Sequence, residues 1–286
     1  MTKGNQSERL TTQQKKNEGA VGIFGDEAKS HDLKVNQMSQ KLIKKLQIDY
    51  PQLSFRCRQS VTKKEINETL KKIDNDLGQT LFVSDSNIKP DGGLIEVLDD
   101  KGNWRVILVS EAKHQGKDIE NILIGKQVGR NNVQDLMVAG NAIERAHKNI
   151  AEIANFMLSE SYFPYVIFLD GSNFLTQDVV VTRPDNRKVK LVHNNGMLNR
   201  IDRLTAANYG MKINTNLCKN KIISLDSTNI KLQATSIYTK GDGTHWSEVE
   251  MLDIMLDIAK TSLKMLGSDI FEQLTKTEMH KNAKKM

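Results

Sequence analysis

Residues 90–114 read PDGGLIEVLDDKGNWRVILVSEAKH, which is the most informative stretch of the chain. Two strand-like segments, Gly93 to Val97 and Trp104 to Val109, lie on either side of the turn-forming run Asp99-Asp100-Lys101-Gly102. Short apolar segments bounded by Asp, Asn and Gly are typical of a β-hairpin. The stretch therefore predicts two antiparallel strands joined by a tight turn.

The predicted hairpin gathers ionisable residues at its open end. A turn centred on Lys101 would place Asp91 directly opposite Glu111, with Cα atoms about 4.5–5.5 Å apart. Lys113 would share a face with Glu111 because side chains alternate along a strand. Two facing carboxylates repel each other unless a cation lies between them, and hard oxygen ligands of this kind suit Mg²⁺.

This arrangement fits phosphodiester hydrolysis. Pro90-Asp91 followed by Glu111-Ala112-Lys113 matches the pattern Pro-Asp, spacer, acidic-x-Lys, whereas no acidic-x-Lys follows Pro184-Asp185. A divalent ion could polarise a phosphoryl oxygen, and Lys113 could orient or deprotonate the attacking water or stabilise the transition state. The same residues also fit a surface hairpin with an ordinary Glu111–Lys113 ion pair, and both interpretations stay open at this stage.

Helix-like and strand-like segments alternate along the rest of the chain. Apolar residues three and four positions apart predict helices over residues 33–46, 64–73, 142–158 and 249–266. The short apolar run Tyr165 to Leu169 predicts a buried central strand. Interleaved strands and helices indicate an α/β or α+β layered fold.

Composition and charge indicate one globular domain. The 286 residues carry 41 Lys+Arg and 35 Asp+Glu, a net charge of +6, which permits a nucleic-acid partner without requiring one. With four prolines and no Pro-rich linker, we expect a flexible arm over residues 1–18, one domain over 19–275 and a basic tail over 276–286.

Several function classes are excluded by what the sequence lacks. No apolar run is long enough for a membrane span, and the polar N-terminus has no signal-peptide core. The widely separated Cys57 and Cys218 predict free thiols, so we expect a cytoplasmic protein without a membrane partner. Walker and Rossmann glycine patterns are missing, and His114, His147 and His193 lack zinc-site spacing.

Residues 135–145 are a candidate DNA-reading segment. Small residues lead into a predicted helix, where Asn141 could cap the N-terminus. Asn141 and Arg145 lie four residues apart and could bind purine edges; Arg200 and Arg203 form a second basic cluster. A plain helix cap and solvated charges explain the same residues equally simply.

Several segments together resemble the EcoRI-like type II restriction endonucleases of the PD-(D/E)xK nuclease superfamily. The resemblance extends from about residue 8 to residue 275, and it is carried by residues 22–26, 50–56, 90–93, 111–118, 137–145, 198–210 and 270–275. It implies a mixed central β-sheet flanked by helices, in a single domain with extended arms. It also implies a homodimer that cuts both strands of palindromic double-stranded DNA with Mg²⁺ and leaves 5′-phosphate ends.

The resemblance assigns roles to individual residues. It implies that Asp91 and Glu111 bind Mg²⁺ and that Lys113 acts on the attacking water, in agreement with the roles inferred from the hairpin. It places residues 137–142 as an extended chain in the major groove. The implied base-recognition residues are Met137, Val138, Ala139, Asn141, Ala142, Glu144, Arg145, Met197, Arg200 and Arg203. The implied phosphate or supporting residues are Lys89, Gln115, Lys117, Lys148 and Asn149.

Two positions depart from the family pattern, Val138 in place of an alanine and Met197 in place of an isoleucine. GAATTC is the expected recognition site. Both substitutions lie where apolar side chains are expected to meet pyrimidines, so recognition of the outer base pair is the part of the readout that they would alter. The family also implies a cognate DNA methyltransferase as a functional partner. A repair or recombination nuclease on the same scaffold, and a non-catalytic sequence-specific DNA-binding protein, are the alternatives.

Overall fold

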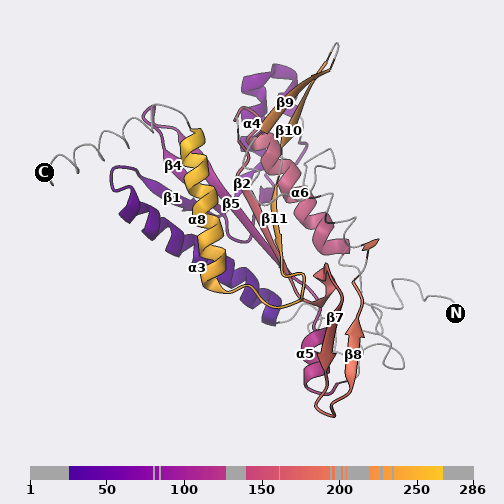
Figure 1. Cartoon of the computed structure of the whole chain (residues 1–286). Helices are drawn as coiled ribbons and strands as arrows, with labels where there is room; N and C mark the ends of the chain where they lie inside the picture. Colours follow the sequence, from indigo (N-terminus) through magenta and orange to yellow (C-terminus); the bar gives the residue numbers. More distant parts are fainter. Residues whose placement is uncertain are drawn as a thin grey trace, which may run out of the picture.

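The computed structural model describes residues 26–79, 81–83, 85–126, 140–160, 162–193, 195–196, 201, 204, 220–225, 228–233 and 235–266. A five-stranded sheet in the order β1-β4-β5-β6-β11 lies at its centre (Figure 1). Strands β1 (Phe55–Arg58), β4 (Leu94–Leu98) and β5 (Trp104–His114) pair antiparallel. Strands β5, β6 (Tyr165–Asp170) and β11 (Ser236–Thr239) pair parallel, so the α/β fold with a mixed central sheet is confirmed.

The β4–β5 hairpin is confirmed, but its predicted register holds only near the turn. Leu98 pairs with Trp104, as a turn centred on Lys101 requires. The register shifts by one residue between Ile95 and Glu96, because a β-bulge sets two residues of one strand against one of the other. Asp91 also precedes the first residue of β4. The prediction that Asp91 lies directly opposite Glu111 is therefore wrong.

All four predicted helices are present with somewhat different ends. They are α3 (Asp26–Asp49), α4 (Lys63–Ile73), α6 (Gly140–Phe156) and α8 (Glu248–Met265). Capping boxes fix the starts of two of them, since Thr62 and Glu65 cap α4 and Ser247 and Glu250 cap α8 reciprocally.

The remaining elements are short. They are three two-stranded sheets, β2 (Val61–Thr62) with β3 (Asn87–Ile88), β7 (Val179–Thr182) with β8 (Lys188–Leu191) and β9 (Asn220–Leu225) with β10 (Thr228–Gln233), the short helix α5 (Asp118–Leu123), and the 3₁₀ turns η1 (Asn75–Gln79) and η2 (Ser172–Phe174). The predicted arm and tail lie outside the described residues, so the division into arm, domain and tail stays a prediction.

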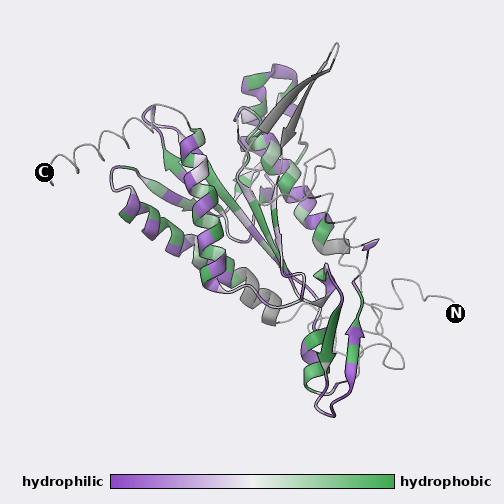
Figure 2. Ribbon diagram, in the orientation of Figure 1, coloured by the Kyte–Doolittle hydropathy of each residue, from purple (hydrophilic) through white to green (hydrophobic). Residues whose placement is uncertain are grey.

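The central sheet separates two apolar layers. Along β6, Val166 and Phe168 pack with α3 and α8, whereas Tyr165, Ile167 and Leu169 pack with α4 and α6. Figure 1 shows the two helix pairs on opposite sides of the sheet, and Figure 2 shows the sheet strands as largely hydrophobic between helices of mixed colour. Because both faces are covered, β6 is buried along its whole length, as its continuous apolar run predicts.

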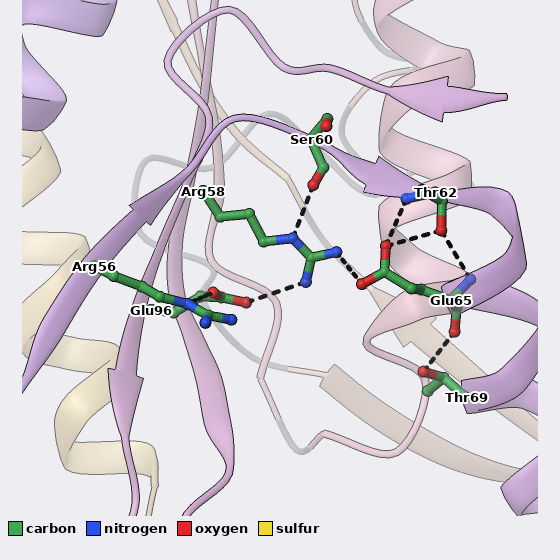
Figure 3. Close-up of polar contacts among 7 residues, drawn as sticks. All are labelled: Arg56, Arg58, Ser60, Thr62, Glu65, Thr69 and Glu96. Carbon is green, nitrogen blue, oxygen red and sulfur yellow. Dashed lines mark hydrogen bonds and ion pairs between the residues drawn. The ribbon is translucent and has the colours of Figure 1, made fainter. Parts of the chain in front are cut away.

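A buried carboxylate on β4 contacts two arginines, one of which, Arg58, joins the sheet to α4 (Figure 3). Glu96 on β4 accepts from Arg56 Nε at 2.6 Å and lies 3.7 Å from Arg58 Nη1. Arg58 also donates to Glu65, the capping residue of α4, and to the Ser60 carbonyl.

Among the described residues, no helix is both long and apolar enough to span a membrane.

Candidate active site

Asp91 lies in the turn that leads into β4, and this turn is fixed against β5. The Gly92 amide donates to the Ser110 carbonyl at 2.9 Å, and the Ser39 hydroxyl of α3 donates to the Gly92 carbonyl at 2.8 Å. A Cβ atom on Gly92 would lie 2.1 Å from Ser110 Oγ, so this close approach requires glycine. The Ala112 amide donates to Asp91 Oδ2 at 3.3 Å and holds the carboxylate against β5.

The three residues predicted to be catalytic converge on one point. Lys113 Nζ lies 2.5 Å from Asp91 Oδ2 and 2.8 Å from Glu111 Oε1. Glu111 and Lys113 therefore share one face of β5, as strand alternation predicts. The bulge displaces Asp91 along the strand, but the long lysine side chain still connects the two carboxylates.

Glu111 is fully buried and accepts hydrogen bonds from both neighbouring elements. The Tyr165 hydroxyl of β6 donates to Glu111 Oε2. The Asn149 amide of α6 lies 3.3 Å and 3.4 Å from the two oxygens of the same carboxylate. These donors orient Glu111 toward Lys113 and Asp91.

Burial and neighbouring charges shift the pKa of each of Glu111 and Lys113 in opposite directions. Burial raises the pKa of Glu111 above its ordinary value, and Lys113 opposes that rise. Burial by itself would lower the pKa of Lys113, but the carboxylates of Glu111 and Asp91 raise it above its ordinary value. The pKa of Tyr165 is raised well above its ordinary value by burial and by Glu111, so its hydroxyl stays a hydrogen-bond donor.

The donor set fits a divalent cation. Asp91 and Glu111 offer oxygen ligands, which hard ions such as Mg²⁺ prefer. With all three groups ionised, the two carboxylates and the Lys113 ammonium leave one net negative charge. The ammonium already occupies the position between the carboxylates, so the fold provides a place for positive charge there.

The predicted supporting residues lie at different distances from this point. Asn149 contacts Glu111 directly, whereas the adjacent Lys148 is exposed on α6. Gln115 is buried just after β5, and its backbone bonds the strand end to the segment after β6. Lys89 is exposed and Lys117 is half-buried. Of these predicted supporting residues, Asn149 contacts Glu111 in the described part of the chain.

Most of the predicted base-recognition residues cannot be placed. Met137, Val138, Ala139, Met197, Arg200 and Arg203 lie outside the described residues. Glu144 and Arg145 are exposed on the first turns of α6. Helix α6 begins at Gly140, so the backbone of Asn141 and Ala142 is helical. The prediction of an extended chain through residues 137–142 is therefore wrong for Gly140, Asn141 and Ala142, and Asn141 lies inside the helix that it was predicted to cap.

Tyr165 is the residue at this site that sequence reasoning missed as a functional group. The predicted strand Tyr165 to Leu169 is confirmed, but its first residue was assigned only to the core. In the parallel register of β5 and β6, Glu111 pairs with Ile167, so Tyr165 lies two residues away on the same face. Finding it required the pairing of β5 with β6, which sequence spacing does not provide.

The chain is similar to known proteins over most of its length. The chain matches the family model described as restriction endonuclease EcoRI over residues 17–273. It is 64% identical over 275 residues to the type II restriction enzyme EcoRI of Escherichia coli, covering 96% of this chain and 99% of that protein. It is 50% identical over 265 residues to the type II restriction enzyme RsrI of Cereibacter sphaeroides, covering 93% and 95%.

Proposed function

This chain belongs to the EcoRI family of restriction endonucleases, and from that premise we propose that it cuts double-stranded DNA at GAATTC with Mg²⁺. It is a type II restriction endonuclease, a site-specific deoxyribonuclease. We propose that it acts as a homodimer, because each chain holds one candidate centre and a palindrome presents two strands to cut. The expected products carry 5′-phosphate and 3′-hydroxyl ends.

The observation that carries the proposal is the Lys113 ammonium between two carboxylates. Asp91 and Glu111 would hold Mg²⁺, which when bound polarises the scissile phosphate and makes a bound water more acidic. Tyr165 and Asn149 fix the Glu111 carboxylate, so that its free lone pairs would point to the ion held between Glu111 and Asp91.

Burial by itself would lower the pKa of Lys113, but the carboxylates of Glu111 and Asp91 raise it, which favours the ammonium form. In that form it donates hydrogen bonds and positive charge, so its role is to orient the attacking water and to stabilise the negative charge that develops on the phosphate. The attacking water would lose its proton to solvent as it bonds to phosphorus, and the 3′ oxygen that leaves would take up a proton from solvent.

Base recognition is proposed to begin at the start of α6. Arg145 is exposed there and could donate to purine acceptors, and Asn141 is on the same helix. Met137, Val138, Ala139, Ala142, Glu144, Met197, Arg200 and Arg203 complete the proposed reading surface. Lys89, Lys117 and Lys148 are proposed to lie near phosphates. A cognate methyltransferase would protect the host's own sites, so premethylated GAATTC should resist cleavage.

Digestion of DNA of known sequence with Mg²⁺, followed by sequencing of the ends, tests this function. Discrete fragments with ends at GAATTC are expected, whereas cuts at another hexamer would refute the proposed site. Smearing or random nicking would indicate a repair-type nuclease, and binding without cleavage would indicate a non-catalytic protein.

A matched pair of variants tests the role of Glu111. Glu111→Gln should abolish cleavage and keep specific binding, because the amide keeps the shape and loses the charge that holds the ion. Glu68→Gln, at an exposed glutamate of α4, should cleave normally. Full cleavage by Glu111→Gln would contradict the assignment.

Replacing Arg145 tests base reading. Arg145→Lys should lose site preference more than non-specific affinity, because a two-pronged guanidinium becomes a point charge. Arg187→Lys, at an exposed arginine before β8, should keep the preference. An unchanged preference in Arg145→Lys would contradict the assignment.

A further inference from the structure

A second group of side chains that could hold a metal ion lies at the same end of the sheet, on its opposite face. His114 directly follows Lys113 at the end of β5 and pairs in register with Asp170, the last residue of β6. Side chains alternate along a strand, so His114 and Asp170 face the layer of α3 and α8, where Phe168 packs against Trp246. Lys113 faces the other layer. The group is therefore separate from the catalytic carboxylates.

His245 completes this group, which we call the His114–Asp170–His245 cluster. One potential ligand atom from each residue lies within 4.8 Å of the others. His114 Nδ1 is 2.7 Å from Asp170 Oδ1, and His245 Nδ1 is 3.6 Å from Asp170 Oδ2. Ligands bound tetrahedrally at about 2.0–2.2 Å are roughly 3.3–3.6 Å from one another, so small side-chain adjustments would close this set around one ion.

The surrounding structure fixes Asp170 and the loop that carries His245, and it leaves the His245 imidazole accessible. Asp170 is fully buried, and its Oδ2 accepts from the Trp246 amide at 3.2 Å. The Trp246 indole donates to the Leu169 carbonyl at 3.1 Å and anchors the loop that carries His245. The His245 side chain is 47% exposed, so an ion can reach the cluster from solvent.

A second carboxylate lies behind the exposed imidazole. Glu120 Oε1 on α5 is 3.3 Å from His245 Nε2, the nitrogen that points away from Asp170. Glu120 Oε2 is buried without a hydrogen-bond partner among the described residues. A metal-bound imidazole typically donates a hydrogen bond from its other ring N–H to a carboxylate, which fixes the ring and raises its basicity. Glu120 is placed for that role.

We propose that the His114–Asp170–His245 cluster binds a divalent transition-metal ion of the Zn²⁺ class, with Glu120 orienting His245. Two imidazoles and one carboxylate favour Zn²⁺ over Mg²⁺, which prefers oxygen ligands alone. The bound ion would join the ends of β5 and β6 to the loop before α8. The site thus goes beyond the proposed DNA cleavage and does not depend on it.

Metal titration of the full chain without DNA tests the site, using Co²⁺ for its visible absorption and Zn²⁺ for thermal unfolding. We expect one equivalent of Co²⁺ to give an absorption band that Mg²⁺ does not displace. At a Zn²⁺ concentration about 100 times Kd, the unfolding midpoint should rise by roughly 5–10 °C. The Glu111→Gln variant should bind the same equivalent, because the catalytic carboxylates are not the ligands.

Variants of exposed histidines give matched controls. His245→Ala and the more conservative His245→Asn should both lose the absorption band and the thermal shift. His193→Ala should keep both the band and the shift. His193 Nδ1 also lies 2.7 Å from a carboxylate oxygen of Asp178. That pair has Lys190 beside it and no second imidazole, so it does not form a comparable metal site. The proposal is overturned by three results: no Co²⁺ bound by the intact chain, binding unchanged in both His245 variants, or binding lost in Glu111→Gln.

Discussion

The environment of Glu111 combines full burial with three polar partners. Burial favours the neutral acid, whereas a metal ligand must be ionised. The hydroxyl of Tyr165, the amide of Asn149 and the ammonium of Lys113 supply the hydrogen bonds that make the ionised form tolerable in the core. Burial therefore raises the pKa of Glu111, and Lys113 and Tyr165 oppose that rise.

Removing the Tyr165 hydroxyl should weaken metal binding. Tyr165→Phe keeps the ring in the core and deletes one hydrogen bond to Glu111, so the Mg²⁺ concentration for half-maximal cleavage should rise about 10- to 100-fold. Tyr162→Phe is the matched control, because Tyr162 is equally buried and its hydroxyl donates to the Val106 carbonyl. Equal Mg²⁺ dependence in the two variants would show that the Tyr165 hydroxyl does not act through Glu111.

The pKa of Glu111 should be visible in the pH dependence of cleavage. Because burial raises that pKa, protons compete with Mg²⁺ at pH values above the ordinary 4.5 of a glutamate. The acid limb of single-turnover cleavage should therefore lie above pH 4.5. Tyr165 lowers the pKa of Glu111, so Tyr165→Phe should move this limb to still higher pH. An acid limb at the same pH in both proteins would contradict the link to Glu111.

At the scale of elements, the turn before β4 positions one half of the site. Asp91 belongs to no strand, and its place depends on the packing of Gly92 against Ser110 and Ser39. The β-bulge between Ile95 and Glu96 then sets where this turn meets β5. A small displacement of this turn would move Asp91, the proposed metal ligand, and a displacement of about 1 Å can cost about 100-fold in rate.

A methyl group at Gly92 should displace Asp91. Gly92→Ala would place Cβ 2.1 Å from Ser110 Oγ, so cleavage should fall by about 100-fold. Adding Ser110→Ala removes the clashing oxygen and should restore part of the rate, while Ser110→Ala alone serves as the control. The measurement is Mg²⁺-dependent cleavage of a single-site substrate. A double variant no faster than Gly92→Ala would exclude this steric cause.

Capping boxes should matter for stability and not for chemistry. Ser247→Ala removes the hydroxyl that accepts from the Glu250 amide at 3.3 Å at the start of α8, and it should cost about 1 kcal/mol of unfolding free energy. Val249→Ala, at a 69% exposed position of the same helix, should cost much less. Chemical denaturation of both variants decides this, and equal losses would mean that the cap is unimportant.

At the scale of the whole molecule, the central sheet separates the proposed catalytic site from the proposed second metal site. One face carries Asp91, Glu111 and Lys113 under α6, and the other carries the His114–Asp170–His245 cluster beside α8. The net charge of +6 is small beside the 76 charged side chains, so the arrangement of charges matters more than their sum. The basic residues Arg145 and Lys148 are exposed on α6, the helix that carries Asn149.

DNA binding by the whole protein should depend strongly on salt. Phosphate contacts by lysine and arginine release counterions, so affinity for a GAATTC duplex should fall by about 1,000-fold or more between 50 and 200 mM salt. Glu111→Gln permits this measurement in Mg²⁺ without cleavage, and wild-type protein in Ca²⁺ provides the comparison. An affinity independent of salt would contradict the proposed contacts of Lys89, Lys117 and Lys148.

Local sequence determined the elements and the chemistry that they carry. The turn at residues 99–102 and its flanking apolar segments fixed the β4–β5 hairpin, and strand alternation placed Glu111 and Lys113 on one face. The four amphipathic helices and the buried strand β6 followed from apolar spacing. These features depend on neighbours in sequence, so sequence alone was sufficient.

Only the tertiary structure decided which segments meet. The bulge moved Asp91 out of line with Glu111, and the pairing of β5 with β6 brought Tyr165 to Glu111 and Asp170 to His114. His245 joined them from a loop near the end of the chain. Contacts between distant segments depend on packing and strand register, in which one residue of shift reverses which face a side chain occupies, and no local pattern encodes that choice.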